Sequence, residues 1–391
     1  MKILFLTFYF EPDLCAGSFR NTSLFKELIA NLRDDDEIEV ITTHPNRYDS
    51  YKIKANDFEK ITKNIVINRV NLPNHGSGII GQIKSFKKYY FKALELVKGK
   101  EYDLVYASSS RLFSAYLGAR IAKKKNAKLY LDIRDIFRET ITDLYKNSVL
   151  KFGLNLILYP IENYTFGNAN HINLVSKGFK SYFNKFKTNY SFFTNGIDDV
   201  FLKEQKNNIN EKKKSKIKTI VYGGNIGEGQ GLDLIIPEVA KKYPKEYKFL
   251  IIGDGGAKSK LLKKIEEEKL DNVELIPPVK RDELINYYKK ADFLFLHLNK
   301  HKAFERVLPS KLFEYGTFNK PIIAGVGGYA RLFLEDNMIN SILFEPTNSL
   351  DLSNKLDQYN YQIIERVKFK ETFSRKQINE KMAKSILNVC K

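Results

Sequence analysis

Cysteine and histidine are scarce in this sequence of 391 residues, which holds two cysteines and five histidines. Cys15 and Cys390 are far apart and lack CxxC or zinc-ligand spacing, so the sequence predicts neither a disulfide framework nor a zinc site. The histidines form no metal-binding pattern. We therefore expect a protein of a reducing compartment, the cytoplasm.

Long hydrophobic runs are missing as well. No stretch approaches the roughly 20 apolar residues that a membrane-spanning helix needs. The apolar start, MKILFLTFYF, is followed by Glu11 and Asp13 without a small-residue cleavage site, which favours a buried first strand over a signal sequence. We expect a protein that does not span a bilayer.

Acidic residues are outnumbered by basic ones, 46 against 65, which gives a net charge of +19. A field of that sign attracts polyanions such as nucleic acids, anionic lipids and nucleotide or lipid diphosphates. Lysine, asparagine and isoleucine are all plentiful, a pattern that a compositionally biased genome also produces, so both explanations stay open. The basic residues are spread among acidic ones without an RRM, KH or zinc-finger motif, and we expect no nucleic-acid partner.

The length suits two α/β domains, because single cores stop growing near about 250–300 residues. Short apolar runs alternate with segments of helical periodicity, which is typical of βαβ units around a parallel sheet. In the first half the strands are expected at 3–8, 37–42, 65–70, 104–107, 129–133 and 171–175, and the helices at 18–32, 79–97, 112–124, 149–166 and 177–186. In the second half the strands are expected at 219–222, 249–252, 273–276, 293–296, 321–324 and 342–344.

The predicted architecture is α/β, with two Rossmann-like domains facing one another across a cleft. The expected boundaries are 1–198, a linker at 199–218 that is rich in lysine and asparagine, 219–372, and a helix at 373–391 that crosses back to the N-terminal domain. Doubly wound sheets bind ligands at the carboxyl ends of their strands. The cleft is therefore the candidate site.

Three runs in the second half carry the chemistry. YGGNIG at 222–227 and IGDGG at 252–256 are glycine-rich turns between a strand and a helix, where free amides and the helix dipole favour an anion. Such a turn alone is as often structural as it is a phosphate site. The third run is LPSKLFEYG at 308–316, followed by KPIIAG at 320–325. In this order the runs resemble the nucleotide-binding half of family 4 glycosyltransferases of the GT-B fold, particularly bacterial members that build O-antigen, capsule or other surface polysaccharides.

The resemblance implies that Glu314 binds the ribose hydroxyls, that Ser310 lies near the diphosphate, and that Lys311 stabilises the diphosphate as it leaves. It also implies donor-side roles for further residues of both halves. These are Gly17, Gly224, Asn225, Gly227, Gly253, Arg281, Gly327 and Gly328.

The sequence departs from the family pattern at two places. The pattern has a second glutamate eight positions before Glu314, where this chain has Arg306. A backbone amide, Glu305 or Lys302 replaces that glutamate, or this subgroup uses none of them. The first glycine loop has Asn225 and Gln230 where the family commonly has Arg and Lys. We therefore expect Lys311 first, and the loop amides second, to bind the negatively charged diphosphate.

The N-terminal half matches the same subgroup at 17–21, 43–48, 132–137, 175–179 and 194–198, so the resemblance spans nearly the whole chain. Arg134 and Asp135 follow a buried strand and are candidate catalytic groups at its carboxyl end. Asp132, His44 and Arg47 are candidate acceptor-side residues. A structural ion-pair network is the alternative for the 132–135 cluster.

The resemblance implies a retaining, metal-independent transferase that uses no cofactor. It would move an N-acetylated hexosamine-type sugar from a nucleotide-diphosphate donor, with UDP as the expected nucleotide, to a lipid-linked or saccharide acceptor. A nucleotide-sugar 2-epimerase and a basic nucleic-acid-binding protein are the alternatives. An acceptor-dependent release of nucleotide diphosphate separates transfer from epimerisation.

Two segments, 83–92 and 149–166, combine apolar residues and lysines at helical spacing, as a helix at a membrane interface does. Burial against the N-terminal sheet is favoured for the second, which is very apolar. The expected membrane-facing residues are therefore those of the first, Lys84, Lys87, Lys88 and Lys92. They would place the protein peripherally on the inner face of the cell membrane.

Overall fold

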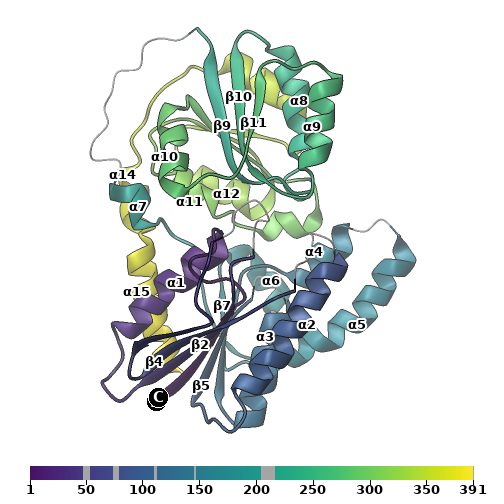
Figure 1. The fold of residues 1–391 in the computed structure, drawn as a ribbon. Helices are drawn as coiled ribbons and strands as arrows, with labels where there is room; N and C mark the ends of the chain where they lie inside the picture. The colour runs from purple at the N-terminus through teal and green to yellow at the C-terminus, as the bar shows by residue number, and fades with distance from the viewer. Residues whose placement is uncertain (47–52, 74–78, 110–111, 145–146, 204–215, 391) are drawn as a thin grey trace. The chain divides into compact units, whose positions relative to one another are not determined.

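The computed structural model describes residues 1–46, 53–73, 79–109, 112–144, 147–203 and 216–390 (Figure 1). The chain divides into two compact units. The first comprises Met1–Asn195 and Arg375–Lys391, and the second comprises Gly196–Ser374. Each contains its own sheet, which confirms the prediction of two Rossmann-like α/β units.

The sheet of the first unit has the strand order β3-β4-β2-β1-β5-β6-β7-β8. All neighbouring strands are parallel except β3 and β4. The strands are β1 (Lys2–Leu6), β2 (Glu37–Thr43), β3 (Phe58–Thr62), β4 (Ile65–Val70), β5 (Leu104–Ser109), β6 (Lys128–Ile133), β7 (His171–Leu174) and β8 (Asn189–Ser191). The apolar start of the chain is thus the central strand β1, as its composition predicts.

Helices cover both faces of this sheet. They are α1 (Ala16–Ile29), α2 (Ile79–Leu96), α3 (Leu112–Lys125), α4 (Phe137–Leu144), α5 (Ser148–Gly167), η1 (Lys177–Phe179), α6 (Lys180–Phe183) and α15 (Arg375–Asn388). The C-terminal helix α15 packs against α1 and inserts Met382 and Ile386 into the core around Phe5. Burial of these side chains explains why the last helix belongs to the first unit.

The second sheet is parallel throughout, in the order β11-β10-β9-β12-β13-β14. Counted along the unit this is the doubly wound order 3-2-1-4-5-6. The strands are β9 (Lys218–Asn225), β10 (Tyr247–Asp254), β11 (Val273–Ile276), β12 (Phe293–His297), β13 (Ile322–Gly325) and β14 (Ser341–Phe344). The helices are α7 (Asp199–Lys203), α8 (Leu232–Lys242), α9 (Lys258–Glu267), α10 (Arg281–Lys290), η3 (Lys302–Arg306), α11 (Lys311–Tyr315), α12 (Gly328–Asn337), α13 (Ser349–Gln358) and α14 (Val367–Thr372).

The linker differs from its expected start. Residues 199–203 form α7, and Phe201 is buried in the core of the second unit. Close by, the Ile197 amide donates to the Phe373 carbonyl at 2.6 Å, and Ile197 pairs with Ser374 in a parallel bridge. The two places where the chain passes between the units therefore lie side by side.

Helix α5 departs most from expectation. Its first half leaves Val149 and Phe152 largely exposed, although the sequence favours burial of this segment. The C-terminal half does pack inward, through Leu158 and Phe166. No helix in the described part of the chain is long and apolar enough to cross a membrane.

Candidate nucleotide-sugar site

The glycine turns of the second unit lie at the carboxyl ends of the adjacent strands β9 and β10. Gly224 and Gly253 have φ of +147° and +148°, in a region that other residues rarely adopt. A Cβ atom on Gly253 would lie 1.8 Å from the Gly224 carbonyl oxygen. Only glycine permits the two backbones to approach so closely.

Lys311 lies directly over the first of these turns. A Cβ atom on Gly224 would be 2.2 Å from the Lys311 Nζ. That ammonium also lies 5.1 Å from the centroid of the Tyr222 ring. The fold therefore brings together two residues that are far apart in sequence. Gly224 provides backbone without a side chain at the end of β9, and Lys311 provides a cation next to it.

A pair of buried tyrosines supports this strand end. The Tyr315 hydroxyl donates to the Phe295 carbonyl at 3.1 Å and accepts from the Gly223 amide at 3.4 Å, while the Tyr288 hydroxyl donates to the Gly223 carbonyl at 3.5 Å. Burial raises the pKa of both phenols, so they stay protonated donors. The sequence gives no sign of this pair's role, because the spacing of its apolar residues indicates only burial.

The first glycine loop is closed from within by Gln230. Its Oε1 accepts from the Asn225 Nδ2 at 2.8 Å and from the Gly227 amide at 3.2 Å. The two positions where the resemblance expects cations thus hold the loop in shape. The Lys311 ammonium lies close to Gly224 of this loop, and its assignment to the diphosphate charge stays a prediction.

His297, at the end of β12, joins this loop to the turn before α13. Its Nδ1 lies 2.6 Å from the Gln230 carbonyl oxygen, and its Nε2 accepts from the Thr347 amide at 2.9 Å. These partners assign the proton to Nδ1 of a neutral ring. Burial lowers its pKa to about 4. The sequence gives no sign of this role, because the partners are 67 and 50 residues away.

This buried imidazole predicts a dependence of stability on pH. The unfolded ring, with a pKa of 6.5, takes up a proton at a higher pH than the folded ring, with a pKa of about 4. The unfolded state is therefore favoured progressively as pH falls from 6.5 to 4, by about 3 kcal/mol in total. Urea denaturation of the wild type and His297→Gln at several pH values measures this contribution. The difference in unfolding free energy between the two should shrink by that amount across the window, and a constant difference would contradict the assignment.

Gly327 and Gly328 begin α12 beside the backbone of η3. Gly328 has a φ of +52°, and a Cβ there would lie 2.0 Å from the Glu305 carbonyl oxygen. It is thus the Glu305 main chain that reaches this turn, while its side chain is exposed. Gly327 caps α12 without a side-chain hydrogen bond, which leaves helix amides at the turn.

Ser310, Lys311 and Glu314 lie at or within α11, and each is partly exposed. Lys311 and Glu314 are three residues apart on the helix and therefore share a face. Arg281 has a different setting: it forms an ion pair with Asp198 at 2.8 Å and lies 5.2 Å from the Phe201 ring. Its expected contact with the donor stays a prediction.

In the first unit, Gly17 and Arg134 meet at the N-terminus of α1. A Cβ on Gly17 would lie 2.5 Å from the Arg134 Nη1. The Arg134 Nε is buried without a hydrogen-bond partner. A guanidinium over a bare helix N-terminus favours an anion, and an anionic ligand would satisfy the buried nitrogen.

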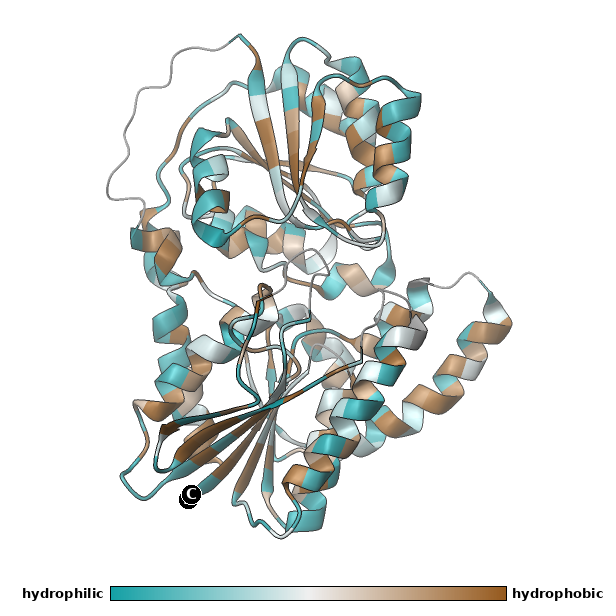
Figure 2. Cartoon of the chain, in the orientation of Figure 1, coloured by the Kyte–Doolittle hydropathy of each residue, from teal (hydrophilic) through white to brown (hydrophobic). Residues whose placement is uncertain are grey.

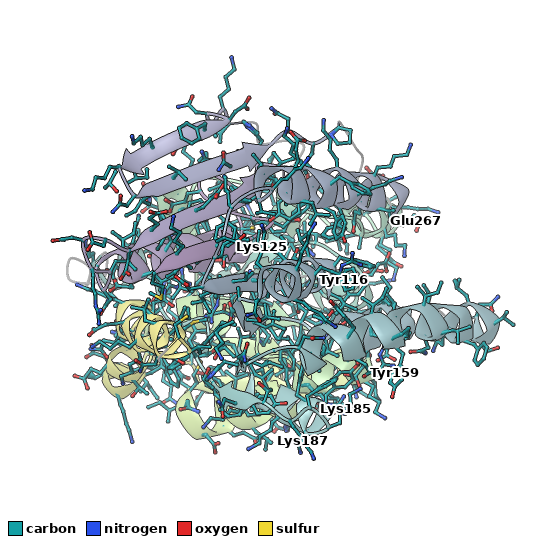
Figure 3. The ribbon with its side chains drawn as sticks, turned by 90° about the horizontal axis from the view of Figure 1, so that it is seen from below. Tyr116, Lys125, Tyr159, Lys185, Lys187 and Glu267 are labelled. Carbon is teal, nitrogen blue, oxygen red and sulfur yellow. The ribbon has the colours of Figure 1, made fainter. Side chains whose placement is uncertain are left out.

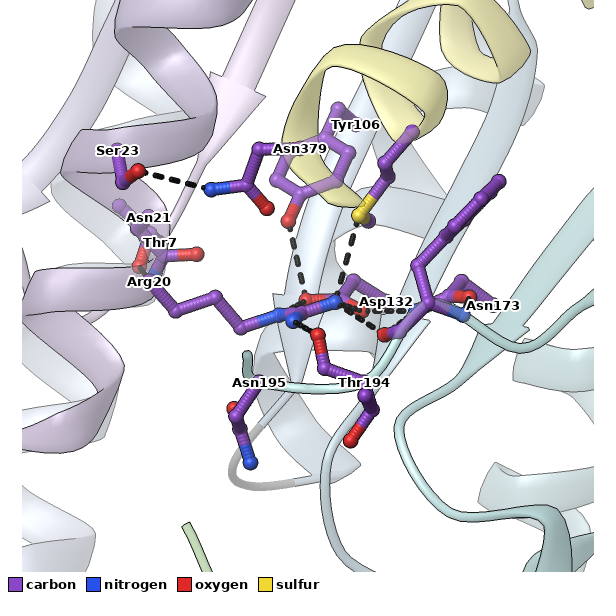
Figure 4. A network of polar contacts seen from close by, with 12 residues as sticks. Thr7, Arg20, Asn21, Ser23, Tyr106, Asp132, Asn173, Thr194, Asn195 and Asn379 are labelled. Carbon is purple, nitrogen blue, oxygen red and sulfur yellow. Dashed lines mark hydrogen bonds and ion pairs between the residues drawn. The ribbon is translucent and has the colours of Figure 1, made fainter. Parts of the chain in front are cut away.

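Asp132 does not have the acceptor-side position that the sequence predicts. It is fully buried, and Arg20 holds it through two hydrogen bonds of 2.8 and 2.9 Å, with Asn173 donating at 2.7 Å and Tyr106 at 3.2 Å (Figure 4). Burial is the largest single effect and opposes ionisation, but the Arg20 charge and the hydrogen bonds from Arg20 and Asn173 together lower the pKa of Asp132 below its ordinary value. Asp132 is therefore part of a structural network and does not face an acceptor.

Arg20 extends the network to the chain crossing. Its remaining donors reach the carbonyls of Phe193 and Thr194 at 2.8 and 2.7 Å. Arg375 then donates to the Asn195 carbonyl at 2.9 Å. The buried arginine and its carboxylate thus fix the segment that leads out of the first unit.

The other acceptor-side candidates are only partly placed. His44 follows β2, and its Nε2 lies 2.6 Å from the exposed Asp57 carboxylate. Asp135 is exposed after β6, and Arg47 lies outside the described residues. In the described part of the chain, no group of three or more His, Cys, Asp or Glu side chains is placed to hold a metal ion.

Comparison with known proteins shows which protein family the second unit resembles. Residues 203–378, which include the glycine turns and α11, match the model of the family described as glycosyl transferases group 1. The chain carries a glycosyltransferase group 1 domain. A 118-residue region is 36% identical to the putative colanic acid biosynthesis glycosyl transferase WcaI of Escherichia coli K12. That match covers 30% of this chain and 27% of WcaI, about a quarter of the relative.

Solved structures extend the likeness to both units. HepE of Anabaena, in complex with UDP and glucose, superposes with a TM-score of 0.66 over 99% of this chain and 100% of its own, at 16% identity. Sucrose-phosphate synthase of Thermosynechococcus elongatus gives 0.66 over 100% and 96%, at 12% identity. WaaG, a glycosyltransferase of lipopolysaccharide biosynthesis, gives 0.62 over 98% and 95%, at 14%. Identities this low show the fold, which is GT-B around the group 1 domain.

Proposed function

We propose that this chain is a retaining, metal-independent glycosyltransferase of surface polysaccharide biosynthesis that acts on the cytoplasmic side of the membrane. Its donor is a UDP-linked sugar of the N-acetylated hexosamine type, and its acceptor is lipid-linked or a saccharide. The observation that carries the proposal is the placement of the Lys311 ammonium over Gly224 at the end of β9. A cation there can meet the negative charge of a leaving diphosphate.

The transfer needs no protein nucleophile. The acceptor hydroxyl attacks the anomeric carbon from the face that the diphosphate leaves, the bond from that carbon to the diphosphate oxygen breaks, and the hydroxyl proton passes to that oxygen. Lys311 and the amides at the N-terminus of α12 stabilise the departing charge. Glu314 accepts hydrogen bonds from the ribose hydroxyls.

The comparisons support a UDP-linked donor and this pathway. HepE was solved with UDP and glucose, WcaI is named for colanic acid biosynthesis and WaaG acts in lipopolysaccharide biosynthesis. The alternative, a nucleotide-sugar 2-epimerase, shares the architecture but converts the donor without an acceptor. The deciding experiment measures UDP release from UDP-sugars with and without a polyprenyl-diphosphate saccharide. Release that depends on the acceptor supports transfer, and conversion of the donor sugar alone supports epimerisation.

Glu314→Gln should weaken donor binding without loss of folding. The substitution removes the charge from a hydrogen bond to ribose, which is worth about 1.5–3 kcal/mol. Calorimetry with UDP should therefore show a tenfold or greater rise in Kd, by the usual conversion of about 1.4 kcal/mol per tenfold. The exposed Glu267 of α9 serves as a matched control, because Glu267→Gln removes only a surface ion pair with Lys263. Equal UDP affinity of both variants would contradict the ribose assignment.

The lysines of α2 are the proposed electrostatic contact with the membrane. Lys84, Lys87, Lys88 and Lys92 are all exposed, beside the exposed Ile83 and Phe91. Each basic residue near an anionic leaflet contributes about 1 kcal/mol, and salt screens that attraction. Changing the four lysines to glutamate should abolish co-sedimentation with anionic vesicles at low salt and leave UDP binding unchanged. Undiminished sedimentation of the variant would remove this helix from the contact.

A further inference from the structure

The first half of α5 carries apolar side chains that the described residues of its unit leave largely exposed. Val149 and Phe152 are 78% and 71% exposed, and Leu156 and Ile157 are 68% and 62% exposed. Figure 2 shows hydrophobic residues along this helix up to its N-terminal end. Between residues 148 and 159 the sequence contains a single charged side chain, Lys151.

The other half of α5 anchors the helix firmly. Glu162 is buried and binds Arg138 and Lys185, each at 3.3 Å, and accepts from the Tyr182 hydroxyl at 2.6 Å. α5 also packs against α3 and α4. In Figure 3 the half of α5 that is N-terminal to Tyr159 extends away from the other helices of the unit. The anchored C-terminal half of α5 therefore fixes the position of the exposed N-terminal half.

A helix that is apolar on most sides is stable in water only when something covers it. The charge of the neighbouring helices indicates what does. α2 and α3 carry eight Lys and Arg side chains and one carboxylate, Glu95. α3 packs against both α2 and α5, and its Lys123 lies over the Tyr164 ring of α5, so this positive layer adjoins the C-terminal half of the apolar helix.

A second copy of the chain docked on α5 would bring two such positive layers together, which is unfavourable. An anionic lipid leaflet would neutralise the layer and also accept the apolar side chains. Tyr159 lies between the two halves, with the Arg138 guanidinium 5.5 Å and the Lys185 ammonium 5.1 Å from its ring centroid. Aromatic and basic side chains in this arrangement are typical of the headgroup level of a bilayer.

We propose that the first half of α5 inserts into the interface of an anionic membrane leaflet. The inserted residues are Val149, Leu150, Phe152, Leu156 and Ile157. A groove of about 560 Å³ along the helix, lined by Arg138, Phe152, Asn155, Leu156, Tyr159 and Pro160, receives part of a lipid. The proposed insertion concerns the attachment of the protein to the membrane. It does not depend on which sugar the protein transfers.

Tryptophan fluorescence tests the insertion directly, because the chain contains no tryptophan. Phe152→Trp places a single reporter on the exposed half of α5. Addition of phosphatidylglycerol vesicles should shift its emission to the blue, and brominated acyl chains should quench it. Leu350→Trp, at a position 67% exposed in the second unit, is the matched control and should show neither effect. If the Phe152→Trp variant binds vesicles and its emission stays unquenched, the proposal is overturned.

A second set of variants measures the energetic effect. The triple variant Phe152→Gln, Leu156→Gln, Ile157→Gln should weaken vesicle binding about a hundredfold, because three buried apolar side chains are lost. The control variant Leu332→Gln, Leu350→Gln, Ile363→Gln, at exposed sites of the second unit, should bind as the wild type does. Equal vesicle binding by the two triple variants would overturn the proposal. It would also be overturned if the wild type is a dimer, the α5 triple variant is a monomer, and the two bind vesicles equally. Vesicle binding is measured without nucleotide or acceptor, so a failed transferase assay leaves this result intact.

Discussion

Lys311→Ala should lower the turnover number about 10²–10³-fold, the usual effect of removing one preorganised stabiliser of transition-state charge. The lysine lies over Gly224, where the backbone can approach a diphosphate closely. Charge on the diphosphate grows as the glycosidic bond breaks, so the loss should appear mainly in kcat and less in KM. Uridine affinity should change little, since uridine lacks the phosphates. Steady-state kinetics with calorimetry for uridine and UDP measures these effects.

Lys263→Ala is a suitable control for this experiment. Lys263 is a largely exposed lysine of the same unit, in a surface ion pair with Glu267. Its loss should change neither turnover nor stability beyond about 1 kcal/mol. If Lys311→Ala retains full turnover, other groups carry the leaving charge, and the amides at the N-terminus of α12 become the first candidates.

Arg20→Met should destabilise the first unit by about 3–5 kcal/mol, because it leaves the Asp132 carboxylate buried without its counterion. Both side chains are fully buried, and the arginine also binds the carbonyls of Phe193 and Thr194. Urea denaturation at neutral pH, followed by circular dichroism, measures the loss. The unfolding of the second unit, which does not contain this network, serves as an internal reference.

Two further variants test that explanation. Arg331→Met removes a surface arginine that pairs with Glu335 and Glu345, and should cost less than about 1 kcal/mol. Arg20→Met combined with Asp132→Asn should recover part of the lost stability, since no uncompensated charge remains. A double variant as unstable as the sum of its single changes would show that the carboxylate and the arginine act separately.

The sequence by itself determined the fold and the two glycine-rich turns of the second unit. Alternating apolar runs and helical periods indicate two parallel sheets, since these patterns follow from the local geometry of strands and helices. The glycines at 224 and 253 mark close backbone approach, which no other residue permits at their φ values. The edge strand β3 escaped prediction because its exposed Phe58 and Ile61 show no alternation of buried and exposed positions.

Tertiary structure alone decided which charges are structural and which surfaces are free. Arg20 and Asp132 are 112 residues apart, and only the fold shows that they neutralise each other in the core. His297 likewise acquires its role from two distant backbone groups. The composition of α5 indicates that its apolar residues leave water, but it cannot say what covers them. Only the fold shows that the second half of this helix buries Leu158 and Phe166 in its own unit, while Val149 and Phe152 of the first half stay largely exposed.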